Sequence, residues 1–172
     1  TLSVRWKEQV AKEYLPLMEG RDAPGEAGTL LLAPSTGSGE QNVSPAISPD
    51  GRFLAFLSEK DLFSVDLFLA DAATGRILRK LTSANSDPHI EALRYIDSSG
   101  TWSPDGKWFA FVVTAGGDNR MVVIDAVNGN QDRVIDFPGL GSVNNPAWSP
   151  DGRQIAFSGS VGGLTDLWLF DL

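Results

Sequence analysis

The sequence contains no cysteine and a single histidine among its 172 residues. The lack of cysteine excludes a disulfide framework, a cysteine-based zinc site and a thiol nucleophile. A metal centre built from several histidines is excluded as well, and a Ser-His-Asp triad would depend entirely on His89. We therefore expect a protein that is not an enzyme and that carries no metal and no cofactor.

Positive charge and long apolar runs are also scarce. Lys and Arg number 14 against 22 Asp and Glu, which gives a formal net charge of -8. Because phosphate backbones and anionic bilayers bind basic surfaces, this charge argues against nucleic acid and against electrostatic docking to a membrane. No apolar run approaches the roughly 20 residues that cross a bilayer, so we expect no direct membrane insertion.

The strongest pattern in the chain is an internal repeat. Ser-Pro-Asp-Gly occurs three times, beginning at Ser48, Ser103 and Ser149. An Ala-Phe pair follows each copy at the same distance, and an apolar run that ends in Asp follows further on. This agreement at several offsets indicates three copies of one structural unit of about 45 residues.

Each copy predicts a set of short antiparallel strands. In the tetrapeptide, Pro presets φ, Asp bonds to nearby backbone amides and Gly adopts a positive φ, which together predict a hairpin turn. Four such strands per unit are typical of a β-propeller blade. The expected fold class is all-β, with about two and two-thirds four-stranded antiparallel blades and a short N-terminal helix.

The second strand of each copy alternates large and small residues, as at Phe56 and Ala55. We expect the large face of one blade to pack on the small face of its neighbour. Such a row of blades leaves an apolar face at each end, and monomers tolerate exposed apolar patches of only a few hundred Å². We therefore expect two open blade faces that are covered by protein partners, by further blades or by the chain itself in an oligomer.

The repeats divide the chain into four expected segments. Residues 1–28 hold a helix and a linker, and residues 29–82 hold a first blade with a preceding strand. Residues 83–137 form a second blade with an inserted loop, and residues 138–172 form an incomplete third blade. We expect the helix over Val4–Leu15, ended by Pro16, and the preceding strand over Thr29–Ala33. A helix of this length is marginal alone and should dock on something.

The motif set resembles the PD40 repeats of TolB-type β-propellers over roughly residues 42–172. It consists of Ser-Pro-Asp-Gly, the Ala-Phe pair and a strand like Asp166-Leu167-Trp168-Leu169. The segment Asn42–Gly51 is most similar to bacterial envelope members. The resemblance implies a non-catalytic protein-protein interaction module in the periplasm or cell envelope. Rings of this type usually hold six or more blades, so it also implies that these blades belong to a larger protein or complex.

Two other interpretations stay open. The chain could be an accessory subunit that joins a membrane-bound assembly through protein contacts. It could also be the regulatory propeller of a peptidase whose catalytic domain lies elsewhere, because some similar propellers are fused to peptidases. Neither a His-Glu-x-x-His nor a Gly-x-Ser-x-Gly motif is present in the sequence, so no hydrolytic activity carries over.

The inserted loop near residues 85–97 is the candidate partner-binding site. It concentrates polar side chains in a segment that lengthens the connection between two blades, and such loops on rigid scaffolds often bind partners. A plain surface loop is the alternative, and a metal or acid-base pair of His89 with Glu91 lacks a second histidine. The candidate residues are Asp87, His89, Glu91, Arg94 and Tyr95.

Other recurring residues have a structural interpretation. The motif aspartates Asp50, Asp105 and Asp151 belong to turns, and the tryptophans Trp102, Trp148 and Trp168 align with apolar core positions. A charged residue recurs once per blade, as Asp66, Arg120 and Asp166. For this set we expect a solvated edge, with a partner-facing role as the alternative.

Overall fold

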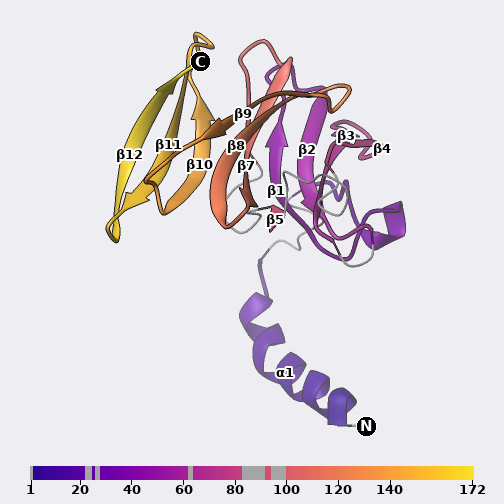
Figure 1. Ribbon diagram of the computed structural model, residues 1–172. Coiled ribbons are helices and arrows are strands. Elements are labelled where there is room, and N and C mark those ends of the chain that lie inside the picture. Colours follow the sequence, from indigo (N-terminus) through magenta and orange to yellow (C-terminus); the bar gives the residue numbers. More distant parts are fainter. Residues whose placement is uncertain (1, 22–24, 26–27, 62–63, 83–91, 94–99) are drawn as a thin grey trace. The chain divides into compact units, whose positions relative to one another are not determined.

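The computed structural model describes residues 2–21, 25, 28–61, 64–82, 100–172 and the backbone of 92–93 (Figure 1). The chain divides into two units, residues 1–30 and 31–172. In the first unit, helix α1 (Leu2–Met18) has no buried residue. The expected end at Leu15 is wrong, because Pro16 lies in the last turn, where it removes only one backbone hydrogen bond. None of the described helices has the length and apolar character that a bilayer span requires.

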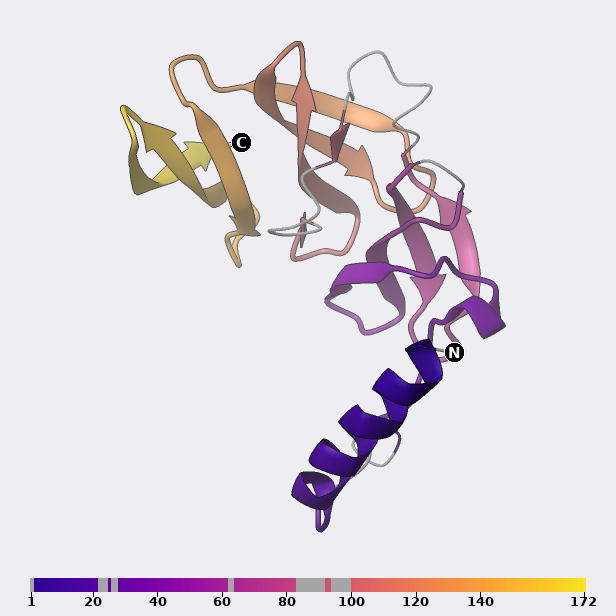
Figure 2. The same ribbon diagram turned by 90° about the horizontal axis from the view of Figure 1, so that it is seen from below.

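The second unit contains three antiparallel sheets, which confirms the all-β expectation (Figure 2). The first sheet has the order β1 (Asn42–Ile47), β2 (Phe53–Ser58), β3 (Asp66–Asp71) and β4 (Ile77–Lys80). In the second, β5 (Ala92–Leu93) and β6 (Thr101–Trp102) pair with β7 (Trp108–Ala115), followed by β8 (Asp118–Asp125) and β9 (Gln131–Asp136). The third has β10 (Ser142–Trp148), β11 (Gln154–Val161) and β12 (Leu164–Asp171).

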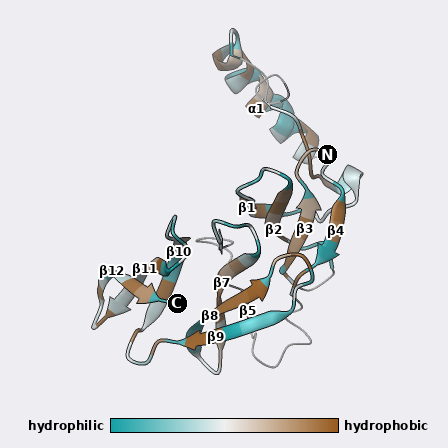
Figure 3. Ribbon diagram, turned by 90° about the horizontal axis from the view of Figure 1, so that it is seen from above, coloured by the Kyte–Doolittle hydropathy of each residue, from teal (hydrophilic) through white to brown (hydrophobic). Residues whose placement is uncertain are grey.

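Hydropathy within a sheet follows burial. Strand β9 begins with exposed polar residues and turns apolar at Val134 and the buried Ile135, and Figure 3 shows this change of hydropathy along the strand. Strand β8, which lies between β7 and β9, is buried over most of its length. The fourth strand is therefore a half-exposed edge strand, and the third strand beside it lies inside the sheet and is mostly buried.

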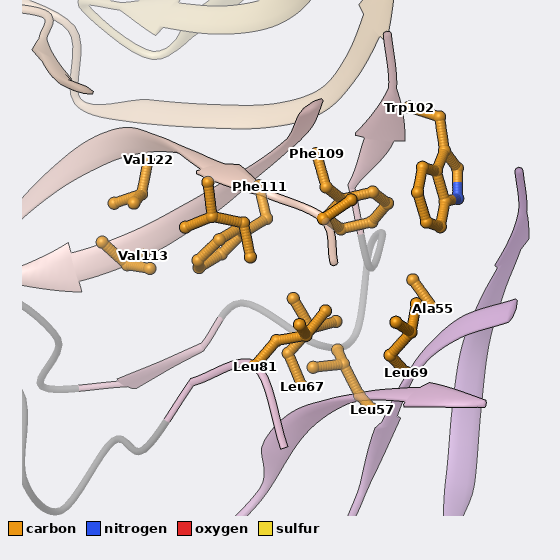
Figure 4. Close-up of a cluster of buried hydrophobic side chains, with 12 residues drawn as sticks. Ala55, Leu57, Leu67, Leu69, Leu81, Trp102, Phe109, Phe111, Val113 and Val122 are labelled. Atoms are coloured by element: carbon orange, nitrogen blue, oxygen red, sulfur yellow. The ribbon is translucent and has the colours of Figure 1, made fainter. Parts of the chain in front are cut away.

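Neighbouring sheets pack as the alternation predicts. One cluster joins Ala55 and Leu57 of the first sheet to Phe109 and Phe111 of the second (Figure 4). A second cluster joins the Ala110 face of the second sheet to the third sheet, whose contribution includes Ile155 and Phe157. The small face of each of the first two sheets thus receives the large face of the next one.

The large face of the first sheet is covered, which corrects the expectation of two open end faces. We call this surface the leading face; it consists of Leu54, Phe56, Phe68 and Ala70, all buried. Leu32 packs against it, and the Gly39 amide donates a hydrogen bond to Ser58 Oγ at 3.2 Å. Ile47, which pairs with Leu54 on the β1 side of this sheet, is 64% exposed.

The cover comes from the segment that precedes β1. Thr29–Ala33 has irregular backbone in place of the expected strand, and a short 3-10 helix (Pro34–Thr36) follows it. Pro34 at the first helical position favours that turn, because its fixed φ suits a helix start. Leu32 and Gly39 of this segment contact the first sheet, and the segment adds no strand to it.

Candidate interaction surface

The small face of the third sheet is uncovered, and we call it the open face; it carries Ala156, Leu167 and Leu169. The side chains of Leu167 and Leu169 are 86% and 61% exposed. Their equivalents are Leu67 and Leu69 in the first sheet and Met121 and Val123 in the second, all 2% exposed or less. The same positions are therefore core in two blades and surface in the third.

The strand register explains why apolar residues stand on both sides of β12. Leu169 pairs with Ala156, while Trp168 pairs with Phe157 on the opposite face. Phe157 is buried against the second sheet. Because β12 is apolar on both faces, its sequence suits a strand that is covered on both sides.

The outer edge of β12 also differs from its equivalents. In the first two sheets the third strand pairs with a fourth, as β3 with β4 and β8 with β9. Among the described residues β12 pairs only with β11, so we call its other side the free edge (Figure 1). Strand edges with unpaired amides and carbonyls are templates for a further strand.

Trp168 is 41% exposed, so its expected core position is wrong. Its equivalents Phe68 and Val122 are buried, and each has a fourth-strand residue beside it in its own sheet, a neighbour that Trp168 lacks among the described residues. The indole N–H donates to the Gly159 carbonyl at 3.2 Å. A Cβ at Gly159 would lie 2.8 Å from Trp168 Cδ1, so this contact needs a glycine.

An apolar hollow of about 300 Å³ lies beside β12. Its walls include Phe137, Leu140, Phe157, Trp168 and Phe170. The ring of Phe137 lies 4.6 Å from that of Phe157 and 5.8 Å from that of Phe170, between centroids. The aromatic walls and the few polar groups make this hollow a place for an apolar side chain.

The sequence predicts a solvated edge for the recurring charged position, and this is wrong for the first sheet. Asp66 is buried, with its Oδ2 2.7 Å from Lys80 Nζ and 2.6 Å from the Ser64 hydroxyl that donates to it. In the second sheet Arg120 Nε lies 2.8 Å from Asp136 Oδ1. Each pair joins a third strand to a fourth. Asp166 is exposed, and no described residue forms an ion pair with it.

Lys80 is held by two carboxylates, because its Nζ also lies 2.6 Å from Asp61 Oδ2. Burial lowers the pKa of Lys80, but the hydrogen bonds to Asp61 and Asp66 outweigh that effect and leave the pKa raised. The ammonium therefore stays charged and neutralises the buried Asp66.

The motif aspartates stabilise turns, as expected. Ser48 Oγ donates to Asp50 Oδ1 at 2.6 Å, and the same oxygen accepts the Arg52 amide at 3.1 Å. The other two turns repeat both bonds. The serine hydroxyl, and after it the backbone amide, holds the pKa of Asp50, Asp105 and Asp151 below the usual range. These carboxylates are occupied by their own turns.

Trp102 and Trp148 pack into the sheets, as expected. Trp102 is buried and meets Phe109 edge-on, with centroids 5.2 Å apart. Trp148 packs against the cluster between the second and third sheets. They connect the first strands of neighbouring sheets and do not form a ligand-stacking surface.

The candidate loop residues Asp87, His89, Glu91, Arg94 and Tyr95 lie outside the described residues. Their role in partner binding stays a prediction. Within the described part of the chain, no group of three His, Asp or Glu side chains is placed to hold a metal ion. The open face is one of the two apolar end faces expected from the sequence, although its exposed residues Leu167 and Leu169 align with core positions of the other copies.

The comparisons with known proteins agree with the repeats. No protein-family model matches the chain. The sequence is 30% identical to the Tol-Pal system protein TolB of Hydrogenovibrio crunogenus over 109 residues, 63% of this chain and 22% of that protein.

Two solved structures are similar in fold. Putative TolB from Agrobacterium tumefaciens matches with a TM-score of 0.59 and 25% identity, over 74% of this chain and 42% of that one. TolB from Acinetobacter baumannii matches with a TM-score of 0.61 and 23% identity, over 77% and 30% respectively. The chain spans about a fifth of the curated relative and less than half of either solved chain. The resemblance to TolB-type β-propellers is thus confirmed.

Proposed function

We propose that this TolB-like propeller segment is a non-catalytic protein-binding module of the bacterial periplasm, and that a protein partner docks on its open face. The observation that carries the proposal is the exposure of Leu167 and Leu169 at positions that are core in both other blades. The name of the curated relative, a Tol-Pal system protein, supports a setting in the cell envelope.

The packing between the sheets indicates what the partner presents. The Ala55 face receives Phe109 and Phe111, and the Ala110 face receives Phe157. By the same rule, the open face fits a sheet that projects large apolar side chains at alternate positions. Burying one leucine fully stabilises a complex by about 2 kcal/mol, so two central leucines supply a useful share of the binding free energy.

A first experiment tests whether the open face is apolar surface in solution. The wild-type chain, with a monomer mass of 18.5 kDa, is measured by light scattering and by binding of a hydrophobic dye. We expect dye binding or self-association that the double variant Leu167→Ser/Leu169→Ser reduces severalfold. The matched control Leu15→Ser/Leu17→Ser removes exposed leucines from α1 and leaves the signal of the third sheet intact. A monodisperse 18.5 kDa monomer that binds no dye contradicts the proposal.

A second experiment identifies the partner. A photo-crosslinking residue at Leu167 is compared in cells with the same residue at Leu15, and the products are identified by mass spectrometry. A soluble envelope protein captured only from Leu167 supports the proposal. A membrane-complex subunit favours the accessory-subunit alternative, and a peptidase domain favours the regulatory-propeller alternative. The loop of Asp87, His89, Glu91, Arg94 and Tyr95 is a second proposed contact, testable by the same crosslinker at Tyr95.

A further inference from the structure

We infer that Asn128 is a self-modification site, where the chain converts an asparagine to aspartate or isoaspartate with the help of Arg79 from the neighbouring blade. The side chain of Asn128 loses its amide as ammonia through a cyclic imide that forms with the backbone nitrogen of Gly129. The site lies in the turn between β8 and β9. The inference is independent of the proposed function, because this turn belongs neither to the open face nor to the free edge.

The residue types at this turn suit imide formation. Asn128-Gly129 is the single Asn-Gly pair in the sequence. The backbone nitrogen of the residue after an asparagine can attack the side-chain amide, and glycine hinders this attack least because it has no Cβ. Asn128 is exposed, so water reaches the side chain and ammonia can leave. The pair therefore combines the chemistry and the access that the reaction needs.

The turn also polarises the side-chain amide of Asn128. Its Oδ1 accepts a hydrogen bond from the Asn130 amide at 2.7 Å. Attack on Cγ places negative charge on this oxygen, and a donor aimed at an oxygen where charge develops stabilises the transition state. The Asn130 amide therefore favours the attack.

The neighbouring blade acts on the nucleophile. Arg79 Nη1 donates a hydrogen bond to the main-chain carbonyl oxygen of Asn128 at 3.0 Å, although the two residues are 49 positions apart in the sequence. When the Gly129 nitrogen loses its proton, its negative charge is shared with this oxygen, because the peptide group is conjugated. A guanidinium at the oxygen therefore stabilises the anion that attacks Cγ.

One bond of the turn opposes the reaction. The Gly129 amide donates to the Asp125 carbonyl at 2.8 Å, which holds the proton of the nucleophile within the turn. The nitrogen has to leave this bond before it attacks, so the modification needs a local opening of the turn. The Arg79 bond is made to the oxygen of the same peptide group and does not depend on the Asp125 contact.

The reaction balances with water alone. The Gly129 nitrogen gives its proton to solvent and forms a bond to Asn128 Cγ, and the bond from Cγ to Nδ2 breaks as ammonia leaves with a proton from water. Water then adds to one of the two carbonyls of the imide. Addition at Cγ breaks the new bond and leaves an aspartate. Addition at the main-chain carbonyl breaks the original peptide bond and leaves an isoaspartate.

Arg79 favours the isoaspartate. Its guanidinium contacts the main-chain carbonyl oxygen and therefore polarises that carbonyl toward water. In the isoaspartate this oxygen belongs to a free carboxylate, which can pair with Arg79. The added backbone carbon also lengthens a turn close to the first blade, since a Cβ at Gly129 would lie 3.1 Å from the Leu81 carbonyl oxygen. The modification therefore alters a contact between two blades.

The first blade supplies a turn that cannot react in this way. Thr74 stands at the position of Asn128, and its hydroxyl accepts the Arg76 amide at 3.3 Å. Threonine thus makes the turn bond that Asn128 Oδ1 makes, without an amide that can leave. Asn128→Thr should keep the turn and abolish the reaction, which assigns any mass change to this residue.

The experiment incubates the full chain at mildly alkaline pH and follows the change from amide to acid by mass spectrometry. Peptide mapping then measures the shares of aspartate and isoaspartate. Arg79→Gln should slow the conversion about fivefold and lower the share of isoaspartate, because the charged donor is lost. Arg133→Gln is the matched control, since it removes the same charge at the equivalent position of β9 and should leave the rate unchanged.

The urea-denatured chain is the reference for the sequence alone. There Arg79 no longer contacts Asn128, so the wild type and Arg79→Gln should react at the same rate and give the same products. Equal rates of the two folded chains overturn the inference, as does a difference that persists in urea. A folded chain that stays unmodified while the denatured chain converts also overturns it, because the Asp125 bond then locks the turn. None of these outcomes affects the tests of the open face, so the two proposals fail separately.

Discussion

The indole N–H of Trp102 donates a hydrogen bond to the carbonyl oxygen of Ala46, with 3.0 Å between nitrogen and oxygen. This bond joins the first strands of the first and second sheets near the small residues that let the sheets approach. Trp148 occupies the equivalent position one blade later, but its buried Nε1 has no hydrogen-bond partner among the described residues. The two equivalent tryptophans thus differ in one hydrogen bond, which the indole N–H of Trp102 makes and that of Trp148 does not.

This difference predicts unequal effects of one substitution. Trp102→Phe should lower the free energy of unfolding by about 1 kcal/mol more than Trp148→Phe, because only the first removes a hydrogen bond. The two variants lose the same volume, so each serves as the control for the other. Urea unfolding followed by circular dichroism measures both. Equal losses would mean that the Ala46 bond contributes nothing to stability.

The turn aspartates predict a dependence of stability on acid. Their pKa values are lowered in the folded chain, so their stabilisation is present above the unfolded pKa of about 3.9 and is lost as the pH falls through the folded values. The triple variant Asp50→Asn/Asp105→Asn/Asp151→Asn should be less stable at pH 7 and should lose less stability between about pH 5 and pH 2.

The matched control replaces three exposed carboxylates with Gln, Glu8 and Glu13 of α1 and Glu19 just after it, which changes the net charge equally. Thermal unfolding at a series of pH values gives the slopes. If the control flattens the profile as much as the turn variant does, net charge and not the turn geometry causes the acid sensitivity.

Replacing Lys80 should lower the free energy of unfolding more than replacing Asp66, the buried carboxylate that it neutralises. Lys80→Met leaves the buried Asp66 without its cation and should lower the free energy of unfolding by about 3 kcal/mol. Asp66→Asn should cost less, because Lys80 keeps Asp61 and partial contact with solvent. The double variant should recover much of the loss. Denaturant unfolding of the three variants measures their free energies of unfolding. A larger loss of stability in Asp66→Asn than in Lys80→Met would contradict this order.

The cover over the leading face predicts a steric effect at Gly39. A Cβ there would lie 2.6 Å from the Lys60 backbone nitrogen, so Gly39→Ala should displace the cover and destabilise the chain by about 2 kcal/mol. Hydrophobic dye binding should rise as Phe56 and Phe68 become exposed. Gly37→Ala is the control, since its site is open and only its φ of +86° is unfavourable, at about 1 kcal/mol. Dye binding that is equal in both variants would refute the steric account.

The sequence predicted the blades because their chemistry is local. Each Ser-Pro-Asp-Gly turn closes through bonds within five residues, such as Ser48 Oγ to the Phe53 amide. The alternation of Ala55 with Phe56 then assigns the faces. Both signals repeat three times, so turns, strands and packing order could be inferred without a structure.

Features that depend on a neighbour could not be inferred. The cover over the leading face comes from Leu32 and Gly39, in a segment with no periodic pattern. Trp168 and Leu167 match core residues of the other copies, and their exposure depends on which strand or sheet lies beside them. Asp66 looks like a surface residue until the fold brings Lys80 against it.

The covered leading face has a consequence for self-association. A row of blades with a large face at one end and a small face at the other would be complementary to itself, and head-to-tail contacts that do not close into a ring grow into fibres. Here Leu32 and the segment around Gly39 occupy the large face, so the open face of one molecule finds no matching surface on the next. Self-association through the open face is therefore expected to stop at pairs of copies that meet open face to open face, and not to grow into fibres.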